Sequence, residues 1–354
     1  MTIGKGWTIA AYAATAALAI GATAQYAEAC TRILSNEKGA AVLVARTMDW
    51  PFTTEPVLTV MPRGLARDGG RVGAVVVVRD NPLKWTSKYG SLVTTVYGIG
   101  AADGVNERGL VAHVLFFRSA DYGLRDASKP GLQATLQAQY ALDNAATVGE
   151  ALGLLQKVQL VMAEVQRNGE TLHATLHLAL EDATGDSAIV EVVDGKQVVY
   201  HGRQYRVMTN DPPYDQQLEL LKAHDFSHPT SDTPVPGNVN PRDRFARATY
   251  FLAVLATAKT ERDGVAGMFS IARNVSIPFG APVGSGTYDT EYRTVTDATN
   301  KRYFFELTTA PNVIWVELKK LNLNAGASVM TLQPDNINLS GDVTGKFEAA
   351  AAPY

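Results

Sequence analysis

The residue best suited to nucleophilic chemistry is Cys30, the single cysteine of this 354-residue chain. It directly follows Ala27-Glu28-Ala29, the small-x-small pattern that signal peptidases cleave. Cleavage after Ala29 would give Cys30 both a thiol and a free α-amine, whose reference pKa is about 7.7–8.0. Such an amine can take the proton of the neighbouring thiol, directly or through one water. One residue would then supply a nucleophile and its base, and cleavage would switch the activity on.

Two other interpretations of Cys30 stay open at this stage. A lone cysteine is often a buried and inert side chain. It can also carry a lipid, which would make the chain a lipid-anchored binding lipoprotein. Lipidation signals place a large aliphatic residue three positions before the cysteine, and here that position holds Ala27, followed by Glu28. An internal disulfide is excluded because there is no second cysteine.

The first 29 residues have the pattern of a secretory signal. Lys5 is the only charge before Glu28, and residues 9–22 are apolar and rich in alanine. We therefore expect residues 1–29 to be a signal peptide and residues 30–354 to be a single domain, secreted across the inner membrane into the periplasm. An uncleaved anchor helix is the alternative. The rest of the chain has no apolar run long enough to span a membrane, so no transmembrane span is expected after processing.

The elements that must position Cys30 follow from patterns of apolar residues and turns. Strands are predicted at 41–49, 57–61, 72–78, 91–97, 110–117, 171–180, 187–193, 196–202, 205–210, 286–297, 301–309 and 312–318. Helices are predicted at 132–142, 147–158, 214–224, 244–258 and 263–273, and a proline-rich loop at 226–242. Asp194-Gly195 predicts a tight hairpin between two of the strands. The order favours an α+β fold in which antiparallel sheets are sandwiched between helices.

Five segments resemble one known family: CTRI (30–33), ARTMDW (45–50), NERGL (106–110), MTNDPPYD (208–215) and TEYRTVTDATNKRYFF (290–305). Together, and in this order, they are similar to the choloylglycine hydrolases, which include bile salt hydrolases and penicillin V acylases. The resemblance implies a four-layer αββα fold of the N-terminal nucleophile hydrolase type, acting on linear amides. It also implies a homo-oligomer, a tetramer in some relatives.

The resemblance assigns catalytic roles to five residues. Cys30 matches the nucleophile, Arg46 an arginine beside the thiol, and Asp49 the carboxylate that holds the α-amine. Asn210 matches the side-chain amide of the oxyanion hole, and Arg244 a second arginine near the site. We expect a guanidinium at Arg46 to lower the pKa of the thiol. Without the resemblance, Arg46 and Asp49 could equally be a surface pair, and residues 209–212 a plain turn.

The expected substrate is a small N-acyl amide. Met48, Phe52 and Phe116 are candidates for an apolar acyl pocket beside the thiol. Phe116 lies where related bile salt hydrolases carry asparagine, and its backbone N–H is the expected second oxyanion donor. An aromatic lining favours a phenoxyacetyl or fatty acyl group. Within this family, the chain most resembles the Gram-negative penicillin V acylases, which also hydrolyse N-acyl homoserine lactones. Hydrolysis of conjugated bile salts is the alternative function.

Neither a cofactor nor a metal is expected. His173 and His177 are four residues apart within a predicted strand and lack the H-E-x-x-H pattern, so they are interpreted as strand-face residues. The glycines at 98–104 lack the G-x-G-x-x-G spacing of a nucleotide site. A formal net charge of −3 and a pI of about 6.1, with no basic patch, argue against a nucleic-acid partner.

Overall fold

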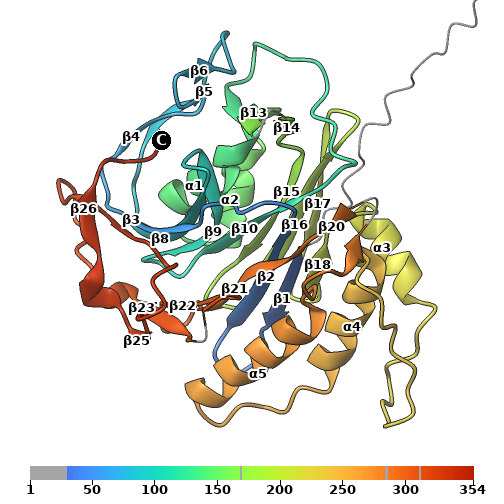
Figure 1. Ribbon diagram of the computed structural model, residues 1–354. Helices are drawn as coiled ribbons and strands as arrows, with labels where there is room; N and C mark the ends of the chain where they lie inside the picture. Colours follow the sequence, from blue (N-terminus) through green and yellow to red (C-terminus); the bar gives the residue numbers. More distant parts are fainter. Residues whose placement is uncertain (1–29, 168–169, 284–285, 311) are drawn as a thin grey trace, which may run out of the picture.

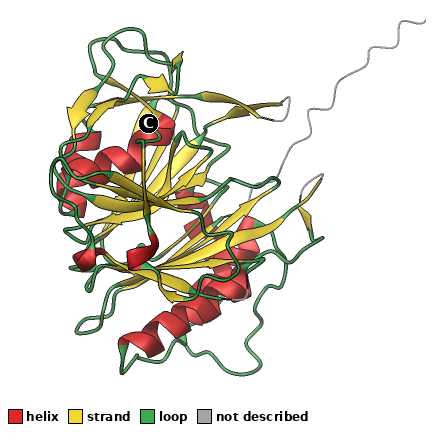
Figure 2. Ribbon diagram, turned by 60° about the vertical axis from the view of Figure 1, so that its left-hand side comes forward, coloured by secondary structure: helices red, strands yellow, loops and turns green. Residues whose placement is uncertain are grey.

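A computed structural model describes residues 30–167, 170–283, 286–310 and 312–354. The predicted signal peptide, residues 1–29, lies outside the described residues. Two β-sheets face each other, and helices cover the outer face of each sheet, which gives the predicted αββα order of layers (Figure 1 and Figure 2). Among the residues that the structure describes, no helix combines the length and the apolar character needed to cross a membrane.

The first sheet has seven strands in the order β18-β1-β2-β21-β22-β23-β25. These are β18 (Val207–Thr209), β1 (Thr31–Ser35), β2 (Leu43–Trp50), β21 (Asp289–Asp297), β22 (Arg302–Leu307), β23 (Ile314–Glu317) and β25 (Gly341–Asp342). Neighbours are antiparallel except for β23 and β25, which run parallel. The first strands of the described chain, β1 and β2, therefore lie inside this sheet, between β18 and β21 from its later part.

The second sheet has nine antiparallel strands in the order β17-β16-β15-β10-β9-β8-β3-β24-β26. These are β17 (Lys196–His201), β16 (Ser187–Val193), β15 (Leu176–Glu181), β10 (Val111–Phe116), β9 (Gly100–Asn106), β8 (Ser91–Val96), β3 (Val57–Met61), β24 (Val329–Leu332) and β26 (Glu348–Ala350). β16 and β17 form the predicted hairpin, in which Asp194 (φ 51°) and Gly195 (φ 70°) both adopt the left-handed conformation of a type I′ turn.

Helices form the two outer layers. α4 (Pro241–Ala253) and α5 (Glu261–Val275) pack against the seven-stranded sheet, and α3 (Tyr214–Leu221) lies beside α4. α1 (Gln137–Asn144) packs against β9 and β10 of the nine-stranded sheet, with α2 (Val148–Leu155) next to it. The predicted cap of α2 is present, because the Thr147 hydroxyl accepts a hydrogen bond from the backbone N–H of Glu150.

Shorter elements connect these layers. They are β4 (Ala66–Asp68), β5 (Arg71–Val72), β6 (Val75–Val76), β7 (Lys84–Thr86), β11 (Gly131–Gln133), β12 (Gln159–Val161), β13 (Glu164–Arg167), β14 (Glu170–His173), β19 (Pro282–Val283) and β20 (Gly286–Thr287). β13 and β14 pair in a separate two-stranded hairpin.

The structure corrects several of the sequence-based elements. The helix predicted at 132–142 begins only at Gln137, after β11 and a 3-10 turn, and the helix predicted at 244–258 ends at Ala253. The strand predicted at 72–78 is two short strands, β5 and β6, because Gly73 adopts φ 54° between them. The strand predicted at 171–180 is interrupted at residues 174–175 and belongs to two different sheets, as β14 and β15. The central strand β9 was not predicted, since its glycines resemble turn residues.

Glycine in β9 is required by close packing and not by a turn. A Cβ added to Gly104 would lie 2.5 Å from the carbonyl oxygen of Leu92, and one at Gly100 would overlap the carbonyl oxygen of Thr135. The glycines therefore allow neighbouring backbone segments to approach β9 closely, which is one of the recognised uses of glycine within a strand.

Candidate active site

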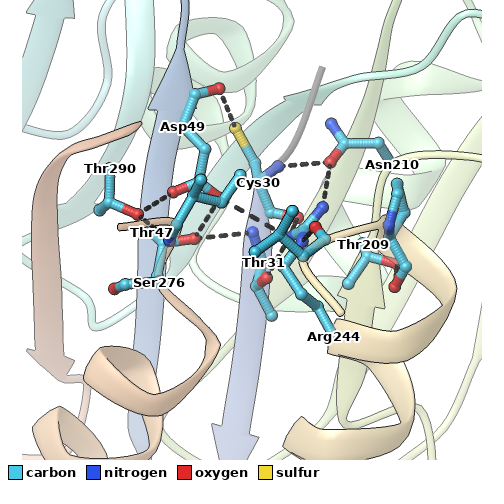
Figure 3. Close-up of polar contacts among 12 residues, drawn as sticks. Cys30, Thr31, Thr47, Asp49, Thr209, Asn210, Arg244, Ser276 and Thr290 are labelled. Carbon is cyan, nitrogen blue, oxygen red and sulfur yellow. Dashed lines mark hydrogen bonds and ion pairs between the residues drawn. The ribbon is translucent and has the colours of Figure 1, made fainter. Parts of the chain in front are cut away.

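Cys30 lies immediately before β1 and is almost completely buried, with 2% of its surface exposed. Its Sγ is 3.5 Å from Nη2 of Arg46 and 3.9 Å from the carbonyl oxygen of Asp49. Both partners belong to β2, which pairs with β1 in an antiparallel register that sets Thr31 opposite Thr47. Figure 3 shows the sulfur above the polar cluster that joins β1, β2, β21 and α4.

The environment of the thiol keeps it protonated at rest. Burial raises the pKa of Cys30, and the Asp49 carboxylate adds to this effect, whereas Arg46 and Arg244 oppose it. Arg46 thus acts in the predicted direction but does not overcome the cost of placing a negative charge in a buried site. A thiol of this kind requires a nearby base before it can attack a carbonyl carbon.

The backbone nitrogen of Cys30 is held by Asn210, which follows β18. The Cys30 N–H donates to Oδ1 of Asn210, and Nδ2 of Asn210 donates to the carbonyl oxygen of Phe116 at 2.7 Å. The group of Phe116 that contacts Asn210 is therefore its carbonyl oxygen, and the oxyanion role expected for its N–H stays a prediction. Asn210 connects the two sheets at the point where the nucleophile lies.

Asp49 is buried beneath Cys30 on the helix side of β2. Its carboxylate accepts hydrogen bonds from the hydroxyls of Thr47, at 2.9 Å, and Thr290, and it lies 3.6 Å from Nη1 of Arg244. Burial raises the pKa of Asp49, while Arg244 and the two hydroxyls act against that rise. The predicted contact between the Asp49 carboxylate and the Cys30 nitrogen is not seen in the structure, in which the Cys30 N–H donates to Asn210 and the carboxylate contacts Thr47, Thr290 and Arg244.

Arg244 links these groups from α4, whose first turn is capped by Asn240. Its Nη1 donates to the carbonyl oxygen of Cys30 at 2.7 Å and to the Thr31 hydroxyl, and its Nη2 donates to Oδ1 of Asn210 at 3.2 Å. One buried guanidinium therefore holds the carbonyl group of Cys30 and the side chain of Thr31, and it also orients Asn210 (Figure 3). The structure brings all five predicted catalytic residues into one cluster.

A cavity of about 570 Å³ opens beside the thiol. Met48 and Phe116 line it, as predicted. Phe52 does not: it lines a separate hollow of about 520 Å³ next to Trp50, and Trp50 takes the place expected for it in the cavity. The Trp50 and Phe116 rings lie 5.9 Å apart, centroid to centroid. Other apolar lining residues that the sequence did not indicate are Val96, Ile99, Ala101, Val114, Leu172 and Leu176.

The two candidate histidines fall on different strands. His173 lies on β14 in the wall of the cavity, 3.5 Å from Glu164, and half of its side chain is exposed. His177 is buried on β15 and stacks on Phe117, with a centroid separation of 4.8 Å. Within the described ranges, no group of three or more His, Cys, Asp or Glu side chains is arranged to hold a metal ion.

Comparison with known protein families gives a match that covers most of the chain. The sequence profile described as "Linear amide C-N hydrolases, choloylglycine hydrolase family" matches residues 30–331 of the chain. The protein belongs to this family. It is accordingly a hydrolase of linear amides, and its two facing sheets and helical outer layers are the N-terminal nucleophile hydrolase fold.

Individual relatives agree with this conclusion. The chain is 38% identical to the penicillin V acylase of Pectobacterium atrosepticum, over 91% of this chain and 90% of that protein. It is 24% identical to the bile salt hydrolase/transferase of Bifidobacterium longum, over 73% of this chain and 86% of the other. Among solved structures, penicillin V acylase from Agrobacterium tumefaciens superposes with a TM-score of 0.80 at 38% identity, covering 91% of this chain and 98% of that one.

Proposed function

We propose that this choloylglycine hydrolase family member is an exported enzyme with an N-terminal cysteine nucleophile. In this proposal it removes an aromatic or fatty acyl group from penicillin V, N-acyl homoserine lactones, or both. The observation that carries the proposal is the position of Cys30: its sulfur lies beside Arg46, its nitrogen is bonded to Asn210, and it lines a cavity with apolar walls. The family match, which begins at residue 30, supports processing between Ala29 and Cys30.

The first half of the reaction forms a thioester. The freed α-amine of Cys30 takes the thiol proton, because burial keeps that thiol protonated. The thiolate then attacks the amide carbon, the S–C bond forms, and the carbonyl electrons move onto oxygen. The second N–H of the Asn210 side-chain amide stabilises that oxyanion, since the amide carries two donors and only one is bonded to Phe116. The C–N bond breaks as the α-ammonium gives its proton to the leaving amine.

The second half of the reaction consumes water. The α-amine, neutral again, removes a proton from a water molecule that attacks the thioester carbon. The C–S bond breaks, the acid leaves, and the sulfur recovers its proton. Arg244 holds the Cys30 carbonyl and Asn210 throughout, so the amine and the oxyanion donor keep their relative positions.

The walls of the cavity suggest the acyl group. Trp50 and Phe116 form an aromatic pair at the thiol, and Val96, Ile99 and Leu176 extend the apolar lining. A flat phenoxy ring or a flexible alkyl chain can fill such a space without leaving polar groups unpaired, whereas the hydroxyls of a bile acid would require partners. Likeness to two penicillin V acylases at 38% identity supports the same choice.

Intact mass and N-terminal sequencing of the exported protein test the processing. We expect a chain that begins at Cys30 with no added mass. A matched variant that retains one extra residue before Cys30 should lose at least about 100-fold in turnover, because its nitrogen is an amide and not a base. A mature chain that begins elsewhere, or a lipid-sized mass increase, would reject the proposal, and the lipid outcome would favour a lipid-anchored binding protein.

Turnover of three amides tests the substrate class: penicillin V, a long-chain N-acyl homoserine lactone and glycocholate. We expect the first two to be hydrolysed with the higher kcat/KM, and Cys30→Ala to abolish hydrolysis of both. If glycocholate alone is cleaved, the enzyme is a bile salt hydrolase and the argument from the cavity walls is wrong.

A further inference from the structure

The side chain of Asn210 is held by groups from three directions. Its Oδ1 accepts hydrogen bonds from the backbone N–H of Cys30 and from Nη2 of Arg244, the latter at 3.2 Å. Its Nδ2 donates to the carbonyl oxygen of Phe116 at 2.7 Å. These contacts keep the amide in one place only if the backbone that carries it is also fixed.

The backbone at Asn210 lies outside the strand ladder. β18 ends at Thr209 and α3 begins at Tyr214, so residues 210–213 form a short connecting loop. Two of the four residues, Pro212 and Pro213, have no backbone N–H to donate. Buried carbonyl groups in a loop of this kind need hydrogen-bond donors from side chains.

Gln217 of α3 supplies these donors and is itself buried, with 2% of its surface exposed. Its Nε2 donates to the carbonyl oxygens of Asn210, at 2.9 Å, and Pro212, at 2.7 Å, and lies 3.3 Å from that of Thr209. Its Oε1 accepts from the Thr209 hydroxyl at 3.0 Å and from the Thr209 N–H at 3.4 Å. One side-chain amide therefore spans the turn that carries Asn210.

These contacts require an amide at position 217. The nitrogen end faces carbonyl oxygens, which need a donor, and the oxygen end faces a hydroxyl and an N–H, which need an acceptor. A carboxylate would place an oxygen against the carbonyl oxygens, and an apolar side chain would leave buried carbonyl groups without a partner.

The groups around Gln217 are anchored in turn. The N–H of Tyr214, at the start of α3, donates to the buried carboxylate of Glu191 at 3.2 Å. The Thr209 hydroxyl also lies 3.1 Å from the carbonyl oxygen of Pro241, the first residue of α4. Gln217 therefore joins the loop of Asn210 to both helices that flank it.

We propose that Gln217 is a positioning residue of this hydrolase: it fixes the backbone of Asn210, so that the Asn210 amide keeps its place beside the Cys30 nitrogen and the reacting carbonyl. The inference rests on the proposed roles of Cys30 as nucleophile and Asn210 as oxyanion donor. Gln217 is not among the described residues that line the cavity, so it acts through Asn210 and not on the substrate.

Gln217→Met keeps a side chain of similar length and removes both N–H donors. We expect kcat to fall about 10- to 100-fold while KM changes less than about 3-fold, because a displaced oxyanion donor weakens the transition state more than the bound substrate. The assay uses whichever of penicillin V, a long-chain N-acyl homoserine lactone and glycocholate is hydrolysed fastest.

Gln139→Met is the matched control for loss of a buried amide. Gln139 lies on α1 and is completely buried, and its Nε2 donates to Asp143 at 2.7 Å. It does not line the cavity. The folded control variant should keep the kcat and KM of the wild type.

A double-mutant cycle separates positioning from packing. Asn210→Ala alone should lower kcat by about 100- to 1,000-fold, the usual effect of losing an oxyanion donor. Adding Gln217→Met to Asn210→Ala should change kcat by less than about 3-fold, because the group that Gln217 positions is already absent. A role in packing alone would lower kcat by the same factor in both backgrounds.

Gln217→Glu replaces Gln217→Met in the same cycle if the methionine variant does not fold. It keeps the shape of the side chain and the oxygen facing Thr209, but it lacks the two donors of the amide. An unchanged kcat, an equal loss in Gln139→Met, or an equal loss in the Asn210→Ala background overturns the proposal. Full hydrolysis by Cys30→Ala or Asn210→Ala would instead reject the proposed function, whatever the result for Gln217.

Discussion

The buried pair of Asp49 and Arg244 should determine much of the stability around the nucleophile. The two groups lie 3.6 Å apart with no exposed side-chain surface, and Arg244 also bonds Cys30, Thr31 and Asn210. Removing one member of a buried pair typically costs about 3–5 kcal/mol, because the other charge is left uncompensated. We therefore expect Arg244→Met to lower the free energy of unfolding by about 4 kcal/mol, and Asp49→Asn by about 3 kcal/mol.

Urea unfolding of both single variants and of the double variant measures the pair itself. The double variant should lose about 2 kcal/mol less than the two singles together, since replacing both charges leaves neither one unpaired. Arg63→Met is the control for an exposed pair: Arg63 donates to both carboxylate oxygens of Glu107 but is 45% exposed, so its loss should cost less than about 1 kcal/mol.

Two results would refute this reasoning. If Arg244→Met costs no more than the Arg63→Met control, Arg244 does not compensate Asp49 in the folded protein. If the decreases in free energy of unfolding of the two single variants add up to the decrease of the double variant, Asp49 and Arg244 do not interact. The position of Arg244 must then be explained by its contacts to Cys30 and Asn210 alone.

Three further outcomes are expected. Burial raises the pKa of Glu181 from 4.5 to about 7, against the opposing pull of Arg32, so the stability it contributes is complete below about pH 4.5 and is lost as pH rises through 7. Between pH 5 and pH 8, urea unfolding should show the free energy of unfolding of the wild type falling by up to about 3 kcal/mol, a fall that is absent in Glu181→Gln. An equal dependence of that free energy on pH in both proteins would contradict this. Val114→Phe should fill part of the cavity and exclude about two or three methylene groups of a substrate. The value of kcat/KM for a long-chain acyl amide should then fall by at least about 10-fold, while the value for a short-chain acyl amide changes little. Equal effects on both chain lengths would show that the acyl chain lies elsewhere. Gly104→Ala should destabilise the protein by about 1–3 kcal/mol in urea unfolding, since its Cβ would lie 2.5 Å from a carbonyl oxygen, whereas Gly153→Ala, with no atom near its Cβ within α2, should be neutral or stabilising.

Much of the framework was predictable from local patterns. β3 was predicted at its observed bounds, and the hairpin of β16 and β17 followed from Asp194-Gly195 because that dipeptide accepts the left-handed conformation at both positions. The cap at Thr147 followed for a similar local reason. The grouping of Cys30 with Asn210 could not come from spacing, since 180 residues separate them; it came from the resemblance of short segments.

What the sequence did not reveal depends on contacts between layers. Thr290 donates a hydrogen bond to Asp49, yet it is an ordinary polar residue in its own segment. Gly104 reads as a turn residue because the carbonyl oxygen that excludes a side chain there belongs to another strand. Phe52 was predicted to line the pocket, as Met48 does. The chain leaves β2 after Trp50, however, and Phe52 lines a different hollow.

The order in which the site's parts are synthesised has a consequence for its lone thiol. Cys30 is made early, whereas Asn210, Arg244 and Thr290 follow 180 to 260 residues later. At roughly 5–20 residues per second, the sulfur waits on the order of 10–50 s before the last of its neighbours exists. During that interval these residues are not yet present around the sulfur. Under oxidising conditions, a second cysteine anywhere in the chain could form a disulfide with it. A sequence with one cysteine avoids internal mispairing throughout its own assembly.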